Sequence, residues 1–422
     1  GESGGQADAI LDDALRSPAI RRWLDAAADG REALLGSHSD ALHPLLAVLL
    51  VRRWTSGRVW LVCRDQRAMD LLATSLETWN VGPLVLPDSE IASLPGVLPD
   101  PEIAAERLTV LRRLAQASAR GAPEPLILTA ATMEAGVPPP DFAADGLLRV
   151  ARGQTRKLGQ LVADLSASGY ERVPQVAHRQ QFALRGGILD VFSLHHGEPL
   201  RIEFFGDSIE SLRHFDIHQQ TTTGHADSGE ILLGQPAESA SLRDGYLRPD
   251  DLVVSIVGGQ PGARVRIEAA DDADPASEPL AFEPEAARLD AGELVMSDPV
   301  RERFFAQLES WREAGWSIHI VCNNEGEIER LADLCASSGF GRAGLRFLVG
   351  TLTSSLAIPE ARLAVLSDAG IFGRYRMTAG RRQRQRRATL QASRAAVDFT
   401  TLDPGELVVH AEHGIGIYRG MT

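Results

Sequence analysis

The sequence predicts an α/β multidomain protein: a mostly parallel sheet domain, an antiparallel β-rich (α+β) domain and a second small α/β domain. Three observations lead to this fold class. The 422 residues are too many for one hydrophobic core. Short apolar runs alternate with helix-length amphipathic segments in the first and later parts of the chain, as in parallel α/β sheets. Between them, two strand-like runs follow each other across a short turn.

The first domain begins, in this interpretation, with a mobile Gly/Ser-containing tail at residues 1–10 and an amphipathic helix at about 10–28. Strands are then expected at 32–35, 59–63, 84–86 and 126–128, with helices at 41–54 and 67–79. The proline-rich stretch 136–142 predicts a domain boundary.

A nucleotide-binding loop would lie after the first strand, at residues 36–43. Phosphate binding there needs a glycine-rich loop, a lysine and a hydroxyl group. This loop has one glycine, Gly36, and no lysine, and Asp40 would repel phosphate. Lys157, the one lysine of the chain, lies far away in sequence. We therefore expect no cofactor, and ATP is not expected to bind.

The antiparallel domain is predicted from a helix at 158–168 that ends at Gly169, followed by strands from Tyr170 onward. The run 200–205 alternates, so that Leu200, Ile202 and Phe204 point one way and Arg201 and Glu203 the other. Gly186-Gly187 predicts a bulge or turn. Asp190 and Asp207 are interpreted as structural residues that pair locally with arginine or cap turns. The arginines of this domain, taken alone, would indicate a solvated strand face: Arg172, Arg179, Arg185, Arg201 and Arg213.

The later part carries another apolar run at 231–236, a strand at 250–257, and an acidic solvated linker at 268–298. A separate α/β unit follows, with helices at 301–314 and 325–337 and strands at 318–322, 347–350 and 363–368. His319, Ser354 and Ser355 do not have the arrangement of a nucleophile elbow, so no catalytic residue is assigned.

Composition and charge exclude several classes of function. The net charge of −14 argues against non-specific nucleic-acid binding as the main task. No apolar run reaches the roughly 18 residues of a membrane span, and the sequence starts without a signal-peptide core. Cys63, Cys322 and Cys335 are scattered, which predicts neither a disulfide framework nor a metal site. A cytoplasmic setting is expected.

An arginine run at residues 374–387 is the candidate nucleic-acid site, although it also suits a solvated linker helix. DNA contact is possible but weak, because aromatic residues are not interleaved beyond Tyr375. The candidate residues are Arg381, Arg382, Arg384, Arg386 and Arg387.

Two sequence strings carry a family resemblance. R-G-G-I-L-D-V-F with R-I-E-F-F-G-D-S-I-E-S-L-R-H-F-D resembles the UvrB-homologous module, which occurs in the excinuclease component UvrB and in transcription-repair coupling factors. V-V-H-A-E-H-G-I-G-I-Y-R-G resembles the opening of the RNA-polymerase-interacting domain of the coupling factors, and only that domain's truncated start is expected here. The matching positions are His410, His413, Gly414, Gly416 and Tyr418.

The resemblance implies a more detailed fold, in which the segment 231–236 is the strand that returns to the first domain. The first domain would be a degenerate P-loop-like sheet, and the last segment the first strand of a Tudor-like barrel. The expected domains are a UvrB-like domain 1a at 1–138, the inserted UvrA-binding-type sheet domain at 139–226, a returning domain 1b with the acidic linker at 227–299, the small α/β domain at 300–372, the arginine-rich linker at 373–400 and the polymerase-domain start at 401–422.

The resemblance also implies a function: a non-catalytic adaptor that brings the excinuclease component UvrA to RNA polymerase stalled at DNA damage. In the family an ATP-driven translocase lies further along the chain, and its motor motifs do not occur here. The implied UvrA-binding residues are Arg172, Phe182, Arg185 and Phe192. Two alternatives stay open: a UvrB-type nucleotide-dependent enzyme of DNA repair, and an architectural DNA-binding protein that uses the arginine run.

Overall fold

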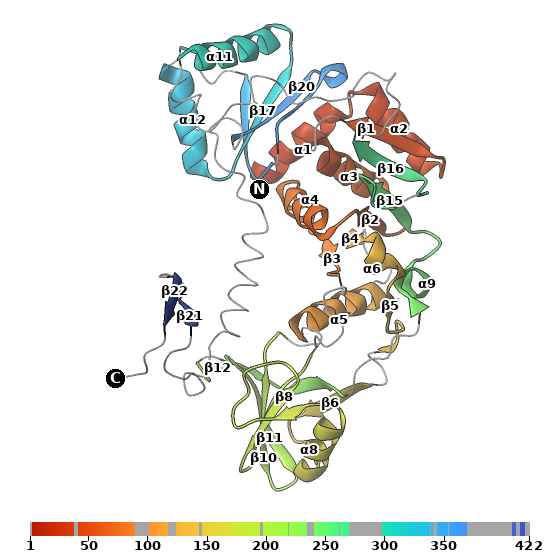
Figure 1. Ribbon diagram of the computed structural model, residues 1–422, viewed down its shortest axis with the longest axis vertical. Helices are drawn as coiled ribbons and strands as arrows, with labels where there is room; N and C mark the ends of the chain where they lie inside the picture. The colour runs from red at the N-terminus through yellow and green to blue at the C-terminus, as the bar shows by residue number, and fades with distance from the viewer. Residues whose placement is uncertain are drawn as a thin grey trace. The chain divides into compact units, whose positions relative to one another are not determined.

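The computed structural model contains parallel and antiparallel sheets, which confirms the mixed α/β multidomain class (Figure 1). It describes residues 2–37, 41–88, 101–116, 124–142, 146–194, 197–217, 219–233, 240–260, 262–269, 298–337, 339–340, 344–352, 354–368, 407–410 and 414–417. The chain forms two compact units, Gly1–Gly373 and Arg374–Thr422. No helix in the described ranges is long and apolar enough to cross a membrane.

A six-stranded parallel sheet forms the centre of the first unit. Its strand order is β1 (Ala33–Ser37), β16 (Val265–Ala269), β15 (Leu252–Ile256), β2 (Val59–Cys63), β4 (Leu126–Thr129) and β3 (Leu84–Val85). The inner strands are continuous apolar runs because both faces of the sheet are covered. One face packs on α3 (Leu42–Arg53) and α4 (Gln66–Thr78); the other packs on α5 (Pro101–Gln116), α6 (Ala130–Glu134) and α9 (Leu242–Tyr246).

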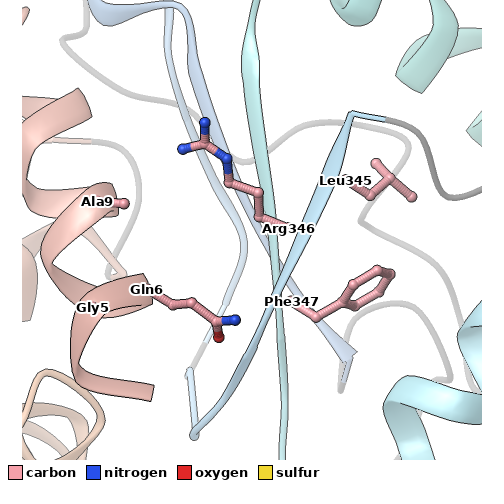
Figure 2. Close-up of a pocket in the computed structure, with 6 residues that line it drawn as sticks. All are labelled: Gly5, Gln6, Ala9, Leu345, Arg346 and Phe347. Carbon is pink, nitrogen blue, oxygen red and sulfur yellow. The ribbon is translucent and has the colours of Figure 1, made fainter. Parts of the chain in front are cut away.

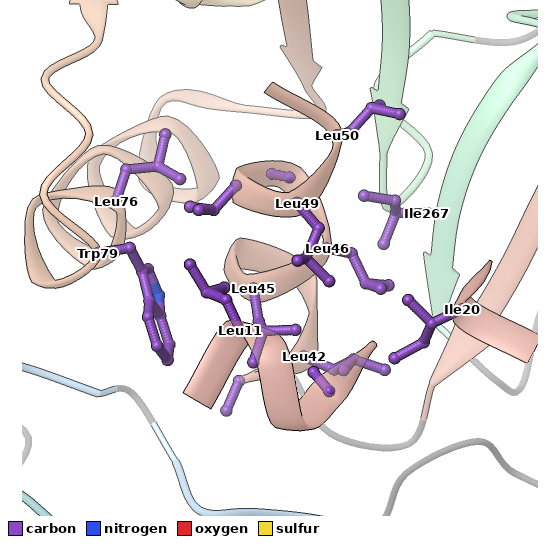
Figure 3. Packing of buried hydrophobic residues seen from close by; sticks show 14 of the residues in the cluster. Leu11, Ile20, Leu42, Leu45, Leu46, Leu49, Leu50, Leu76, Trp79 and Ile267 are labelled. Carbon is purple, nitrogen blue, oxygen red and sulfur yellow. The ribbon is translucent and has the colours of Figure 1, made fainter. Parts of the chain in front are cut away.

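The N-terminal residues form two helices, α1 (Glu2–Ala14) and α2 (Pro18–Ala28), where the sequence predicted a mobile tail and one longer helix. That prediction was wrong at the tail because α1 buries Ala7, Ile10 and Leu11 in the core. The break follows from Ser17, whose hydroxyl accepts a hydrogen bond from the Ile20 amide at 3.3 Å, and from proline at the first helical position of α2. Figure 3 shows Leu11 and Ile20 among the leucines of α3 and the side chains of Trp79 and Ile267.

The inserted domain lies between β5 (Gly136–Val137) and its antiparallel partner β14 (Ala240–Ser241). It contains α8 (Leu158–Ala167) and a six-stranded sheet of order β12-β11-β10-β9-β8-β7. The strands are β7 (Glu171–Arg172), β8 (Gln181–Arg185), β9 (Ile188–Phe192), β10 (Leu200–Phe205), β11 (Ser208–Phe215) and β12 (Thr222–Ala226). All pair antiparallel except β7 with β8.

A two-stranded sheet joins the start and the end of the insert: β6 (Leu147–Ala151) pairs antiparallel with β13 (Ser228–Leu232). The family resemblance implied that the segment 231–236 is the strand that returns to the first domain. That assignment is wrong, because Ile231 pairs with Leu148 and packs in the insert's own core. The chain rejoins the parallel sheet through β15 and β16, and the acidic stretch 270–297 lies outside the described residues.

The last sheet of this unit has the order β18 (Leu345–Val349), β17 (Ser317–Cys322), β20 (Leu363–Ser367) and β19 (Leu356–Ile358). Helices α11 (Asp298–Glu313) and α12 (Glu325–Ser337) cover one face. The other face shares a core with α1 and α3 through Val321, Leu348 and Val365. The sequence predicted a separate unit; instead α1 is packed directly against this sheet.

The unit Arg374–Thr422 contains an antiparallel hairpin of β21 (Leu407–His410) and β22 (Gly414–Ile417), in which His410 is the register partner of Gly414. The sequence predicted a strand and turn here, and a second strand follows. Of the implied polymerase-domain residues, His413 and Tyr418 lie outside the described residues. The predicted arginine-rich site at 374–387, with Arg381, Arg382, Arg384, Arg386 and Arg387, lies outside them as well.

Candidate partner-binding face

The inserted sheet has two chemically different faces, because successive side chains of a strand point to opposite sides. The inner face packs Phe182, Leu189 and Ile202 on α8. We call the opposite side the outer face. According to the strand register of β8 to β11, it carries Arg185, Ile188, Asp190, Arg201, Glu203, Phe205 and Arg213. Most of these side chains are charged, and Arg185, Ile188 and Phe205 are exposed, so this part of the face differs from the apolar inner face and is the candidate site.

A buried carboxylate organises the charges of the outer face. The Asp190 side chain is 1% exposed. Its Oδ1 accepts a hydrogen bond from Arg201 Nε at 2.6 Å and its Oδ2 one from Arg201 Nη2 at 2.8 Å, which makes the pair bidentate. Arg185 Nη2 donates to the same Oδ2 at 2.9 Å. Two guanidinium groups on one carboxylate leave this cluster with a net charge of +1.

The two arginines of this cluster differ in exposure. Arg201 is 16% exposed and lies over the ring of Phe215, with 4.4 Å between the guanidinium carbon and the ring centroid. The hydrogen bonds that Arg201 donates to Asp190 raise the pKa of Arg201 above its ordinary value. Arg185 is 52% exposed, so its guanidinium is both oriented by Asp190 and open to solvent. This geometry suits the binding of a carboxylate from a partner. The prediction that Asp190 pairs locally with arginine is confirmed.

The structure separates the four residues singled out from the sequence. Arg185 lies on the outer face, and Arg172 is exposed on the short edge strand β7. Phe192 belongs to the outer side of β9 but is 5% exposed, because it packs with Val176 and Phe215 and Arg179 lies over its ring. Phe182 is fully buried on the inner face. The structure thus places Phe182 in the core with α8 and not on the exposed surface, and its part in partner binding stays a prediction.

Sequence reasoning missed three members of the outer face: Arg201 as the second guanidinium on Asp190, and the apolar pair Ile188 and Phe205. The sequence could have predicted the outward position of Phe205, because Phe205 follows Arg201 and Glu203 in the same alternating pattern along β10. Phe205 is 76% exposed, whereas Phe204 is 9% exposed in the core.

A glycine turn connects β8 to β9 at the end of this face, as the sequence predicted. Gly186 has φ of 60°, which favours glycine. Gly187 accepts a hydrogen bond from the Phe204 amide at 2.8 Å, and a Cβ on Gly187 would lie 2.7 Å from the Phe204 carbonyl oxygen. Only a glycine lets the turn approach β10 this closely.

The carboxyl edge of the parallel sheet, where a nucleotide would bind in such folds, is a weaker candidate. Residues 38–40 lie outside the described residues. In the described part, Asp65 accepts a hydrogen bond from the Ala68 amide at 2.8 Å, and Glu268 accepts one from the Gly258 amide at 2.9 Å. These carboxylates occupy amides of the kind that hold phosphate, so the described residues of this edge do not fit ATP.

Three other places among the described residues lack a catalytic arrangement. A shallow groove of about 500 Å³ lies between α1 and β18, lined by Gly5, Gln6, Ala9, Leu345, Arg346 and Phe347 (Figure 2). On β17, His319 Nε2 lies 3.2 Å from Asp13 Oδ2, and burial lowers the pKa of His319. Ser355 accepts a hydrogen bond from the Ser367 amide at 2.9 Å. Among the described residues no group of histidine, cysteine and acidic side chains fits a metal ion.

Comparison with known proteins points to the same sheet. Residues 148–235 match the family model of the UvrB interaction domain. The sequence is 34% identical over 206 residues to a transcription-repair-coupling factor of Myxococcus xanthus, covering 46% of this chain and 17% of that protein. It is 24% identical over 489 residues to the transcription-repair-coupling factor of Escherichia coli K12, covering 93% of this chain and 42% of that protein. The Bacillus subtilis 168 protein of this name is 28% identical over 220 residues, covering 50% of this chain and 18% of that protein. The chain thus spans less than half the length of these relatives.

Proposed function

We propose that this chain, which is similar to the N-terminal region of bacterial transcription-repair coupling factors, is a non-catalytic adaptor that recruits UvrA to RNA polymerase stalled at damaged DNA. One observation carries the proposal. The segment that matches the UvrB interaction domain folds into the sheet whose outer face presents Arg185, half exposed and held by buried Asp190.

The chemistry of the outer face supports a protein partner with acidic groups. Arg185 offers a planar guanidinium whose orientation is fixed before binding, which lowers the entropy lost on association. Arginine and aromatic side chains are also the residues that most often dominate binding energy in interfaces. Among the described residues, no group of histidine, cysteine and acidic side chains could hold a metal ion.

The remaining parts of the proposal follow from the relatives. The matched relatives are longer than this chain, and we propose that ATP-driven translocation on DNA belongs to regions outside it. Residues 401–422 are proposed to begin a polymerase-interacting domain. The domain boundaries stated above remain proposals.

Binding of the chain to UvrA from the same organism tests the function. We expect wild type to bind, and Arg185→Ala to reduce affinity at least tenfold, since it removes the exposed guanidinium that would bind a UvrA carboxylate; tenfold corresponds to about 1.4 kcal/mol. Isothermal titration calorimetry or surface plasmon resonance gives the affinities.

Arg149→Ala is the matched control for this measurement. Arg149 lies on β6 of the same domain, is 81% exposed, and pairs with Glu230 away from the Asp190 cluster. We expect it to bind like wild type, and thermal melting shows that both variants are folded. Absence of wild-type binding, or equal affinity of Arg185→Ala and Arg149→Ala, would contradict the proposal.

A further inference from the structure

Two large apolar side chains are exposed at one end of the outer face. Phe205 is 76% exposed and Ile188 is 37% exposed. Among the described residues, Leu34 and Val349 are the other large hydrophobic residues with comparable exposure, at 43% and 38%. A phenylalanine that keeps three quarters of its surface in water gains little from folding, so its place in the sheet needs another explanation.

The strand register brings these two side chains to the same end of the sheet. Ile188 is the first residue of β9 and the register partner of Glu203, and Phe205 follows Glu203 by two positions on the same side of β10. The adjacent Gly187, hydrogen-bonded to Phe204, has no side chain that could cover the ring. The aromatic surface is left open by the local sequence.

The exposed apolar pair is continuous with the cationic cluster. Ile188 is also the register partner of Arg185 across the glycine turn. An oriented guanidinium and an open aromatic ring therefore lie on one face, separated by the width of about two strands. Protein–protein interfaces combine such features: an apolar centre excludes water, and charged groups beside it fix the orientation of the two partners.

We propose that Phe205, supported by Ile188, is the apolar contact of the docking face and inserts into an apolar recess of UvrA, next to a UvrA carboxylate that pairs with Arg185. This inference rests on the proposed function and assigns the partner's surface: a recess for an aromatic ring beside an acidic residue. The sequence analysis assigned neither Ile188 nor Phe205 to the binding site.

The test compares Phe205→Ala, Arg185→Ala and Leu34→Ala for UvrA binding at low and high salt. Leu34→Ala is the matched control, because Leu34 is also exposed but lies on β1 of the parallel sheet. We expect Phe205→Ala to reduce affinity at least tenfold at both salt concentrations. The loss for Arg185→Ala should shrink at high salt, because screening weakens charge pairs and not apolar contacts.

The outcomes separate this inference from the proposed function. If wild type does not bind UvrA, the proposed function fails and the inference with it. If Arg185→Ala weakens binding while Phe205→Ala equals Leu34→Ala, the function stands and the inference is overturned. If Phe205→Ala alters only self-association of the chain in sedimentation, the inference is also overturned. Ile188→Ser is the second variant, expected to weaken binding by a smaller factor with unchanged melting.

Discussion

A single buried carboxylate decides where the charges of the outer face point. Asp190 carries hydrogen bonds from Arg185 and Arg201, and it sits where only a side chain with two acceptor oxygens can satisfy both guanidinium groups. The orientation of the exposed Arg185 guanidinium therefore depends on the position of the buried Asp190 carboxylate. We regard Asp190 as a positioning residue that contacts no partner itself.

Asp190→Asn tests this role. The amide keeps the size but removes the charge, so Arg201 and Arg185 repel each other without compensation. We expect UvrA affinity to fall although Asp190 is 1% exposed. The free energy of unfolding should decrease by about 3 kcal/mol, the low end for a broken buried pair, because both arginines can turn to solvent.

Denaturant titration and binding measurements on the same sample separate stability from positioning. Asp190→Glu, which restores the charge at a longer reach, should recover part of the affinity. If Asp190→Asn binds UvrA like wild type once folded, the positioning role is refuted.

At the scale of elements, close approaches of backbone set the shape of both sheets. The loop after β15 returns over β2, and a Cβ on Gly259 would lie 1.8 Å from the Val62 carbonyl oxygen. This distance is shorter than the corresponding distance at Gly187. The atom that the added Cβ would meet belongs to the backbone of the central strand β2, so the shift of a side chain cannot relieve the clash.

Gly259→Ala should therefore destabilise the parallel sheet by more than about 3 kcal/mol, beyond the usual range for an overpacked position. Chemical denaturation measures the change. Gly245→Ala in α9 is the control, since nothing lies within 4 Å of its added Cβ and alanine favours a helix. Similar stabilities for the two variants would show that the loop after β15 can move.

The sequence predicted those elements whose pattern is local. The buried strands around Leu61 and Ile320 and the helix that ends near Gly169 appear close to their predicted bounds. The helix α1 was missed because Gly4 and Gly5 lower its intrinsic helix propensity, and tertiary packing on α3, β18 and β20 stabilises it. Burial of Phe182 was likewise not predictable, because its face is fixed by the pairing of β8 with β9.

At the scale of the whole molecule, a buried ion-pairing site ties α1 to the last sheet of the first unit. His319 of β17 faces Asp13 of α1, and Arg16 and Arg346 also lie near this carboxylate, at 2.7 Å and 3.8 Å. Burial lowers the pKa of His319, although Asp13 opposes this effect. The unfolded chain therefore binds a proton at a pH at which the folded chain does not.

Stability should fall as the pH decreases below the ordinary histidine value of about 6.5, and this contribution should be constant above it. His319→Gln removes the titrating group and should give a flatter dependence of the unfolding free energy between about pH 6.5 and 5. Denaturant melts of both proteins over this range measure the difference. A parallel pH dependence in the two proteins would rule out His319 as the source.

The antiparallel pairing of β6 with β13 also has a consequence for the evolution of the inserted domain. Leu147 and Leu232 are register partners, and the Leu233 amide donates to the Gly146 carbonyl, so the chain enters and leaves the insert at adjacent points. Residues 146–233 can thus be gained or lost by a host without separating the ends of the host chain. A domain with such a junction can be inserted into a loop of a different host protein in a single genetic event, because the host chain needs no rearrangement to accommodate its two adjacent ends.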